Sequence, residues 1–406
     1  MLTQTAPRAH GLDTLRSVAI AAVILFHVHD FHGDGTLPAP VVSVANLGWM
    51  GVDLFFVLSG YLIASQFLKP YLVGHRPGLW EFYRNRIFRV LPAYGTVLAL
   101  YYAWPLWRES HNLPPLWELI TFTQNLFASI SLDHAFSHVW SLCVEEHFYL
   151  LFPLIVLPMM LKPSLNKTVA VIAGLVLLGM SIRGLFLFHL LRPLADSGES
   201  FGSAYMSRIY YPTYSRLDGL LAGVALGLMR TFRPAGWRAL TRRGHSLLAA
   251  GVCLVGFSVY LFWDRFESVG GASAVGIVVG PPVLSLVLGC LVASALSSNG
   301  WLRVQIPGAR LIATLAYSLY LTHKELIHLV DFWFPSIAEG AMYRWLGVYA
   351  VCCLAAATVL YLCVEQPFLR LRDKRRSGTQ IGRGAGLSSY SSSQQEQNEG
   401  ARQKVL

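Results

Sequence analysis

The chain has 406 residues, of which 54% are hydrophobic and only 13% are charged. Soluble domains carry roughly 25% charged residues, so this composition argues against an ordinary soluble protein and indicates one embedded in a membrane. The formal net charge of +10 is common in proteins that bind nucleic acids or anionic surfaces. Here we attribute most of the excess to cytoplasmic loops, and we expect a lipid bilayer rather than nucleic acid as the partner. The six cysteines show no metal-ligand spacing, so no metal site is expected.

Ten apolar stretches are candidates for membrane helices, each of which needs about 20 mostly apolar residues. They are centred on residues 15–30, 48–68, 88–106, 140–161, 168–191, 209–229, 246–263, 273–297, 310–330 and 343–364. The first stretch lacks a small-residue cleavage site, so we expect a membrane helix there and no cleaved signal peptide. The sequence therefore predicts an all-α fold, a polytopic membrane helix bundle of about ten transmembrane helices.

Lys and Arg alternate between the loops of this predicted bundle. Loops 69–89, 161–167, 230–244, 298–310 and 366–376 together hold 19 of them, whereas loops 30–47, 105–136, 192–208, 264–272 and 331–344 hold 5. Because cytoplasmic loops carry the excess of basic residues, we place the first group and both termini in the cytoplasm. We expect a multi-pass protein of the plasma (inner) membrane.

The composition changes after Arg376, where the chain becomes rich in Ser, Gln and Gly and loses its apolar pattern. Such a segment cannot bury enough apolar surface to fold. We therefore expect a transmembrane domain over residues 1–376 and a disordered cytoplasmic tail over residues 377–406. No appended soluble domain is expected.

The first predicted helix carries two ionisable residues, Arg16 and His27. Such residues cost free energy inside a membrane and are functional candidates for that reason. They are eleven residues apart, which is about three helical turns and places them on one face. The alternative is that Arg16 extends to the inner interface while His27 ends the helix at the outer interface.

The second and fourth predicted helices carry carboxylates near their outer ends. Asp53 either holds the imidazole of His27 or lies at the outer interface. Glu145 and Glu146 are adjacent in an apolar helix and point about 100° apart, so we expect one of them to face a functional site. The glycine after Ser59 would allow another helix to approach closely.

The third predicted helix begins with Arg84, Arg86 and Arg89. The planar fork of arginine donates two parallel hydrogen bonds and suits a phosphate group. The alternative is a set of positive anchors at the inner membrane surface.

Later helices add four more polar candidates. Arg216 and Asp218 lie at the outer start of the sixth predicted helix, and Tyr317 and His323 lie on the ninth. Six candidates from five helices then fall in the outer half of the bundle, whereas four arginines fall on the inner side. The outer set is His27, Asp53, Glu145, Arg216, Asp218 and His323, and the inner set is Arg16, Arg84, Arg86 and Arg89. This pattern predicts a chamber with a general base above a basic, phosphate-compatible mouth.

Seven motifs in order identify a family resemblance. They are the R-x10-H of Arg16 and His27, GVDLFFVLSGYLI, the R-x-x-R of Arg86 and Arg89, WSLCVEEHFYLLFP, RLDGLLAG, YSLYLTH and VEQPF. Together they span residues 11 to about 370, and the chain resembles the acyltransferase 3 family of integral-membrane enzymes, which O-acylate sugars and some antibiotics. One departure is His147, where the family often has Gln.

The resemblance implies the roles of the candidate residues. It implies a cytoplasmic acyl-CoA donor as co-substrate, no permanently bound cofactor, and an acceptor hydroxyl presented from the other side. His27 would be the catalytic base, with Glu145 or Asp53 holding its imidazole. We assign Arg16, Arg86 and Arg89 to binding of acyl-CoA, and Glu146, Arg216, Asp218, His323 and Tyr317 to binding of the acceptor substrate.

Several functional alternatives stay open at this point. The first expectation is transfer of an acyl group, by default acetyl, to a carbohydrate of a surface or lipid-linked glycan. A second is acylation of a small metabolite such as a macrolide sugar. A proton-coupled transporter would also place ionisable residues inside the membrane. A sensor or scaffold would use the same chamber to bind lipid or glycan without catalysing a reaction.

Overall fold

The computed structural model describes residues 9–33, 37–75, 78–127, 134–161, 164–196, 201–267, 273–335 and 342–374. Within these ranges the regular structure is helical, and the β-type pairing is one isolated bridge between Asn112 and His134. The all-α prediction is therefore confirmed for the described part of the chain. The expected tail, residues 377–406, lies outside the described residues.

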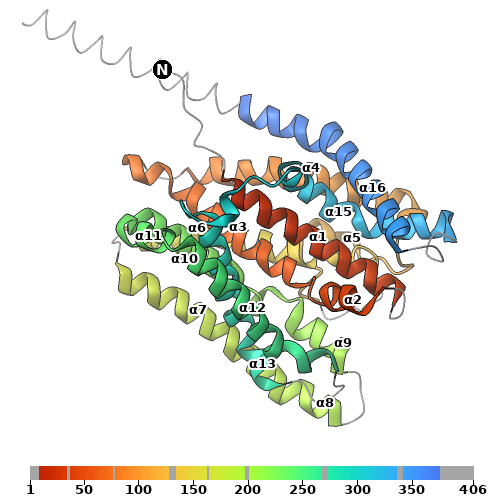
Figure 1. Ribbon diagram of the computed structural model, residues 1–406, viewed down its shortest axis with the longest axis horizontal. Helices are drawn as coiled ribbons and strands as arrows, with labels where there is room; N and C mark the ends of the chain where they lie inside the picture. Colours follow the sequence, from red (N-terminus) through yellow and green to blue (C-terminus); the bar gives the residue numbers. More distant parts are fainter. Residues whose placement is uncertain are drawn as a thin grey trace, which may run out of the picture.

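The α-helices of the described residues are shown in Figure 1. They are α1 (His10–His32), α2 (Ala39–Asn46), α3 (Met50–Leu68), α4 (Leu79–Ala103), α5 (Leu116–Ile120), α6 (Trp140–Leu161), α7 (Leu165–Phe186), α8 (Arg192–Asp196), α9 (Phe201–Tyr205), α10 (Asp218–Phe232), α11 (Pro234–Thr241), α12 (Gly244–Glu267), α13 (Ala274–Val278), α14 (Gly280–Ala295), α15 (Ala309–Trp333) and α16 (Met342–Leu360).

Each of the ten expected stretches contains a helix, but the helices differ in their suitability as membrane spans. Five helical segments of the described chain are long and apolar enough to cross a membrane: His10–His32, Ala39–Leu68, Ser137–Met160, Leu165–Leu194 and Arg344–Lys374. The others are shorter or more polar. The protein is thus a helical membrane protein, while the count of ten spans and the location of both termini stay predictions.

Two of the expected stretches are not single helices. The stretch 209–229 begins with irregular turns, and its helix α10 starts only at Asp218. The stretch 273–297 is divided into α13 and α14 at Val279. Pro281 lies in the first turn of α14, where the missing N–H of proline is tolerated. Apolar composition alone does not reveal such interruptions.

α1 lies at the centre of the bundle, between α3 and α15 (Figure 1). Ser17 Oγ donates a hydrogen bond to the carbonyl oxygen of Ala309 at 2.7 Å, and His27 contacts His323 further along both helices. α1 and α15 therefore run in the same direction. Residues at successive positions along α1 therefore lie beside residues at successive positions along α15, and the two helices bring His27 and His323 together.

α3 and α10 pack closely through glycines. A Cβ atom at Gly60 would lie 2.1 Å from the Leu220 carbonyl oxygen, and one at Gly223 would lie 2.1 Å from the Val57 carbonyl oxygen. Only residues without a side chain permit this backbone approach. The expected close approach at Gly60 is confirmed.

The peripheral helices turn apolar side chains outward. In Figure 1, α7, α12 and α13 lie on one side of the bundle and α16 lies on the opposite side. Leu177, Leu185, Phe257 and Val351 are among the large apolar side chains that these helices expose. Apolar outer faces of this kind are suited to contact with lipid.

Candidate active site

A cavity of about 720 Å³ lies among α3, α4, α6 and α15. On α3 its lining runs from Val52 to Lys69 just beyond the helix, which corresponds to roughly 25 Å of helix rise. On α15 the lining runs from Ala313 to Tyr320. Gln66 and Lys69 are exposed, so the cavity reaches the surface at that end.

The surface end of the cavity is basic. Its lining includes Lys69, Arg86, Arg89 and Arg372, which we call the basic mouth, and Arg16 reaches the lining from α1. The expected placement of Arg16, Arg86 and Arg89 around one chamber is therefore what the structure shows. Arginine forks at such a mouth are suited to phosphate groups.

Arg86 and Arg89 have different partners within the basic mouth. Arg86 donates to Gln66 Oε1 at 3.1 Å and lies 4.9 Å from the centre of the Tyr149 ring. Arg89 instead forms an ion pair with the buried carboxylate of Glu365, which belongs to the π-helical turn Tyr361–Glu365. Arg86 forms no ion pair in the described residues, although its charge also acts on Glu145 and Glu146, so it is more available to an anionic ligand than Arg89.

Tyr317, Glu145 and Glu146 lie near the middle of the cavity, but not in equivalent positions. Tyr317 lines it and donates to the Val90 carbonyl oxygen at 3.0 Å. Glu145 lines it and accepts hydrogen bonds from Ser59 Oγ at 2.8 Å and from Tyr149 OH at 2.7 Å.

Glu146 is not among the residues that line the cavity, as expected for the second of two adjacent carboxylates. Its buried Oε1 has no hydrogen-bond partner in the described part of the chain. The expectation that one of the two carboxylates faces a functional site therefore fits Glu145.

Three histidines from three separate elements meet just beyond the Tyr320 end of the cavity. His323 lies three residues after Tyr320 on α15, and its Nε2 is 3.2 Å from Nδ1 of His27 on α1. The ring of His138 is centred 5.1 Å from that of His323 and 6.5 Å from that of His27. We call these three residues the histidine cluster.

The hydrogen bonds of the histidine cluster define one tautomer of His27. Its Nδ1 lies 2.9 Å from the Val23 carbonyl oxygen, which can only accept, so Nδ1 carries the proton. Nδ1 of His323 likewise faces the carbonyl oxygens of Leu319 and Tyr320, which leaves His323 Nε2 as an acceptor for His27. The Nε2 atom of His27 is then unprotonated and can act as a base.

The predicted pairing of His27 with a carboxylate is wrong. The hydrogen-bonding partners of His27 in the described residues are Val23 and His323, and neither Glu145 nor Asp53 bonds to it. A buried neutral imidazole, His323, occupies the place that the carboxylate was expected to take. A neutral partner avoids burying an additional negative charge inside the bundle.

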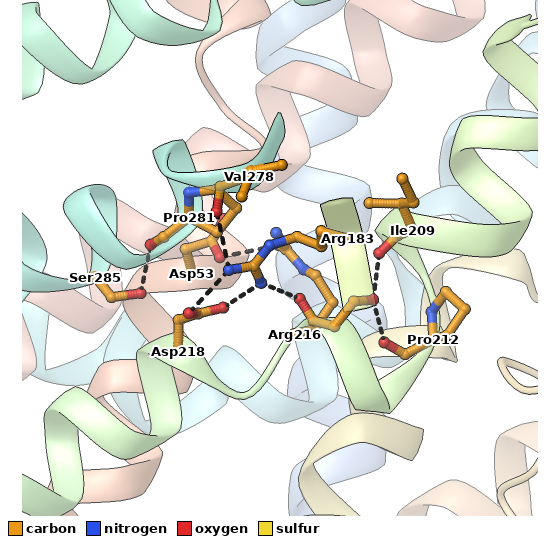
Figure 2. Close-up of polar contacts among 10 residues, drawn as sticks. Asp53, Arg183, Ile209, Pro212, Arg216, Asp218, Val278, Pro281 and Ser285 are labelled. Atoms are coloured by element: carbon orange, nitrogen blue, oxygen red, sulfur yellow. Dashed lines mark hydrogen bonds and ion pairs between the residues drawn. The ribbon is translucent and has the colours of Figure 1, made fainter. Parts of the chain in front are cut away.

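Asp53, Arg216 and Asp218 lie in a separate polar cluster, shown in Figure 2. Arg216 Nη2 donates to Asp53 Oδ1 at 2.9 Å. Arg183 of α7 donates to Asp218 Oδ2 at 2.7 Å and also to the carbonyl oxygens of Ser215 and Val278.

All four charged side chains of this cluster are buried. They connect α3, α7, the start of α10 and the end of α13, so the pairing stabilises helix packing. None of them is among the residues that line the cavity. The cluster therefore connects helices and does not line the chamber in which Asp53, Arg216 and Asp218 were expected.

Sequence reasoning missed two residues of these clusters, His138 and Arg183. Arg183 could have been found, since it is an arginine within an apolar helix. His138 precedes the WSL motif, but nothing local shows that this turn lies beside α1 and α15. No group of three or more His, Cys, Asp or Glu side chains in the described residues has a metal-binding arrangement.

Comparison with known proteins identifies the family. The model of the acyltransferase 3 family, described as an acyltransferase domain, matches residues 9–364. The chain belongs to this family. It is therefore an acyltransferase, and its apolar helices make it a membrane member of the family. No solved structure matches the chain significantly.

Curated relatives of the chain carry acetyltransferase names. A Bacillus subtilis (strain 168) protein, YrhL, provisionally named a peptidoglycan O-acetyltransferase, is 29% identical over 381 residues, covering 88% of this chain and 54% of YrhL. The O-acetyltransferase OatA of Staphylococcus aureus (strain NCTC 8325) is 25% identical over 378 residues, covering 88% of this chain and 56% of OatA. The chain spans about half the length of these relatives.

Proposed function

We propose that this acyltransferase moves an acyl group, by default acetyl, from acyl-CoA to a hydroxyl group of a surface or lipid-linked carbohydrate. The names of YrhL and OatA support O-acetylation, and that of YrhL supports a glycan acceptor. The observation that carries the proposal is that two features lie next to each other. A basic, surface-reaching cavity ends at Tyr320, and the His27–His323 pair lies one helical turn beyond it.

The cavity suits acyl-CoA in charge and in size. The basic mouth would bind the phosphates of CoA, with Arg86 as the arginine whose contacts are to neutral groups. A volume of about 720 Å³ lies within the range of roughly 300–1,000 Å³ of ligand pockets. The pantetheine arm would then extend along α3 and α15 toward Tyr320, and would bring the thioester to the histidine cluster.

His27 would act as general base and then as general acid. Its Nε2 takes the proton of the acceptor hydroxyl while the oxygen attacks the thioester carbon, and it returns the proton to the leaving thiolate. The protonated ring is held by Val23 and by the lone pair of His323 Nε2. Acid–base help of this kind contributes about 10²–10⁴ in rate.

Deuterated acetyl-CoA supplied to membranes that contain the protein tests this proposal. Mass spectrometry would follow the label into envelope glycans and small metabolites while the released CoA is quantified. We expect a labelled glycan and stoichiometric CoA with the wild type, and a rate about 10²–10⁴ lower with His27→Ala at a matched protein level.

His147→Gln is the matched control for this experiment. It changes a histidine of α6 that contacts Thr213 and not the histidine cluster, so the label should be retained. If the label were found on a small metabolite, the acceptor would be that metabolite and not a glycan. Unimpaired transfer by a folded His27→Ala variant would contradict the catalytic assignment.

A further inference from the structure

His138 is the member of the histidine cluster whose ring forms no hydrogen bond of normal geometry within the described residues. It lies in the short turn Ser137–Val139 before α6 and is 3% exposed. Neither ring nitrogen makes a hydrogen bond of normal geometry in the described part of the chain, and the Tyr320 carbonyl oxygen near the ring is already paired with His323 Nδ1. His27 and His323, by contrast, both have hydrogen bonds to backbone carbonyl groups.

An unpaired buried imidazole indicates a missing ligand. A neutral imidazole always carries one N–H donor and one acceptor lone pair. Burying both without partners costs free energy, and buried polar groups are paired in the great majority of native sites. A polar group that arrives with a substrate would supply the missing partner.

The turn that carries His138 is held firmly from several sides. Phe136 has a left-handed backbone conformation with φ 60°, and its N–H donates to Glu109 Oε1 at 2.9 Å. Lys324 Nζ donates to Ser137 Oγ at 3.0 Å, and Tyr320 OH donates to the carbonyl oxygen of His138. Strained conformations persist where the surroundings over-determine them, and they are frequent at functional sites.

His138 lies beside both the Tyr320 end of the cavity and His323 of the His27–His323 pair. Tyr320 and Ser141 line the end of the cavity and are hydrogen bonded to each other at 2.7 Å. The ring of His138 is centred 5.4 Å from that of Tyr320 on one side and 5.1 Å from that of His323 on another. A thioester carbonyl that passes Tyr320 therefore arrives beside His138.

We infer that His138 is a further catalytic residue, whose ring N–H donates a hydrogen bond to the acyl carbonyl oxygen. The inference rests on the proposed acyl-CoA donor. As the acceptor oxygen bonds to the acyl carbon, its proton passes to His27 Nε2 and the carbonyl π electrons move onto the carbonyl oxygen. His138 stabilises that oxyanion and keeps its own proton. The carbonyl then re-forms, the carbon–sulfur bond breaks, and the proton passes from His27 to the thiolate.

Two unreactive CoA derivatives test this contact without an acceptor. One is the methyl-ketone analogue of acetyl-CoA, in which a methylene replaces the thioester sulfur, and the other is S-ethyl-CoA, which has no carbonyl. Dissociation constants would be measured on the purified full chain. One hydrogen bond to the carbonyl should make the wild type prefer the ketone by about 3- to 10-fold. His138→Phe should reduce this preference to about one without changing the affinity for S-ethyl-CoA.

Further variants separate this role from a structural one. His138→Gln keeps an N–H donor and should keep part of the ketone preference, whereas His27→Ala and His147→Gln should keep all of it. In transfer assays His138→Phe should lower kcat by about 10²–10³ while KM for acetyl-CoA changes little.

Three outcomes would overturn the inference. They are a wild-type preference near one, an unchanged preference in His138→Phe, and an equal loss of affinity for both analogues in that variant. If the wild type bound neither analogue, the donor assignment itself would be wrong, which distinguishes failure of the proposed function from failure of the His138 contact alone.

Discussion

At the scale of single residues, the contact between His323 and His27 indicates a positioning role for His323. Its Nε2 accepts from His27 Nδ1 and so favours the tautomer with a free His27 Nε2. We predict that His323→Phe lowers kcat at least about tenfold and leaves KM for acyl-CoA unchanged. His323→Gln can present an amide oxygen to the same proton and should retain more activity. Equal losses in both variants would argue against this role.

Substitution of the two arginines of the R-x-x-R motif should have different effects, one on CoA affinity and the other on stability. The contacts of Arg86 are to neutral groups, whereas Arg89 pairs with the buried Glu365. We predict that Arg86→Gln mainly raises the dissociation constant for CoA and weakens its dependence on salt. Arg89→Gln should mainly lower the unfolding temperature, because it leaves a buried carboxylate without its cation. Calorimetry and thermal unfolding of the two variants would check this, and the reverse pattern would contradict it.

The sequence predicted that several candidate residues share one chamber, which the structure shows, but it did not predict the hydrogen-bond partner of His27. Arg16, Arg86, Arg89, Glu145 and Tyr317 do share one chamber, because intramembrane polar residues have few other places to face. The partner of His27 could not be predicted, since it depends on how α1 and α15 are aligned. The same holds for His138, which is placed by a turn between helices.

At the scale of helices, the contact between α3 and α10 depends on the absence of side chains. A Cβ at Gly60 would meet the backbone of Leu220 at 2.1 Å, whereas nothing lies within 4 Å of a Cβ at Gly95 on α4. We predict that Gly60→Ala lowers the unfolding temperature. Gly95→Ala is the matched control and should leave it unchanged or raise it, since Ala favours a helix over Gly by roughly 1 kcal/mol. Equal effects would contradict the packing argument.

The ion pair between Arg183 and Asp218 connects α7 to α10 inside the bundle (Figure 2). Removing one partner leaves an uncompensated buried charge, so we predict that Arg183→Met destabilises the protein by about 3–5 kcal/mol. The double variant Arg183→Met with Asp218→Leu should recover part of this loss. Unfolding in detergent measures both, and an intact stability in Arg183→Met would show that the pair contributes little.

Helix boundaries show where sequence reasoning was sufficient and where it was not. Long apolar runs located α1, α3, α6 and α7 within a few residues. The stretch 209–229 was expected to be one apolar segment with Arg216 and Asp218 at the outer start of its helix, and α10 does begin at Asp218, but the turns that fill residues 209–217 were not predicted. Those turns carry the Ser215 carbonyl oxygen, which accepts a hydrogen bond from Arg183. This is a tertiary interaction with no local signal.

At the scale of the whole molecule, the parallel helices α1 and α15 join the cavity to the histidine cluster. Arg16 of α1 lines the cavity, and His27 of the same helix lies in the cluster. α15 lines the cavity from Ala313 to Tyr320 and then presents His323. The bundle therefore places a basic, surface-reaching cavity and a histidine base at successive levels of the same two helices.

Acetyl transfer in sealed vesicles of defined orientation tests this central claim most directly. Deuterated acetyl-CoA would be added to the outside of inverted and of right-side-out vesicles that carry the wild type or His27→Ala, and glycans would be examined for the label. We predict labelled glycan only with the wild type and only in inverted vesicles, where the basic mouth faces the added acetyl-CoA. Label in right-side-out vesicles, or equal label with His27→Ala, would contradict the account.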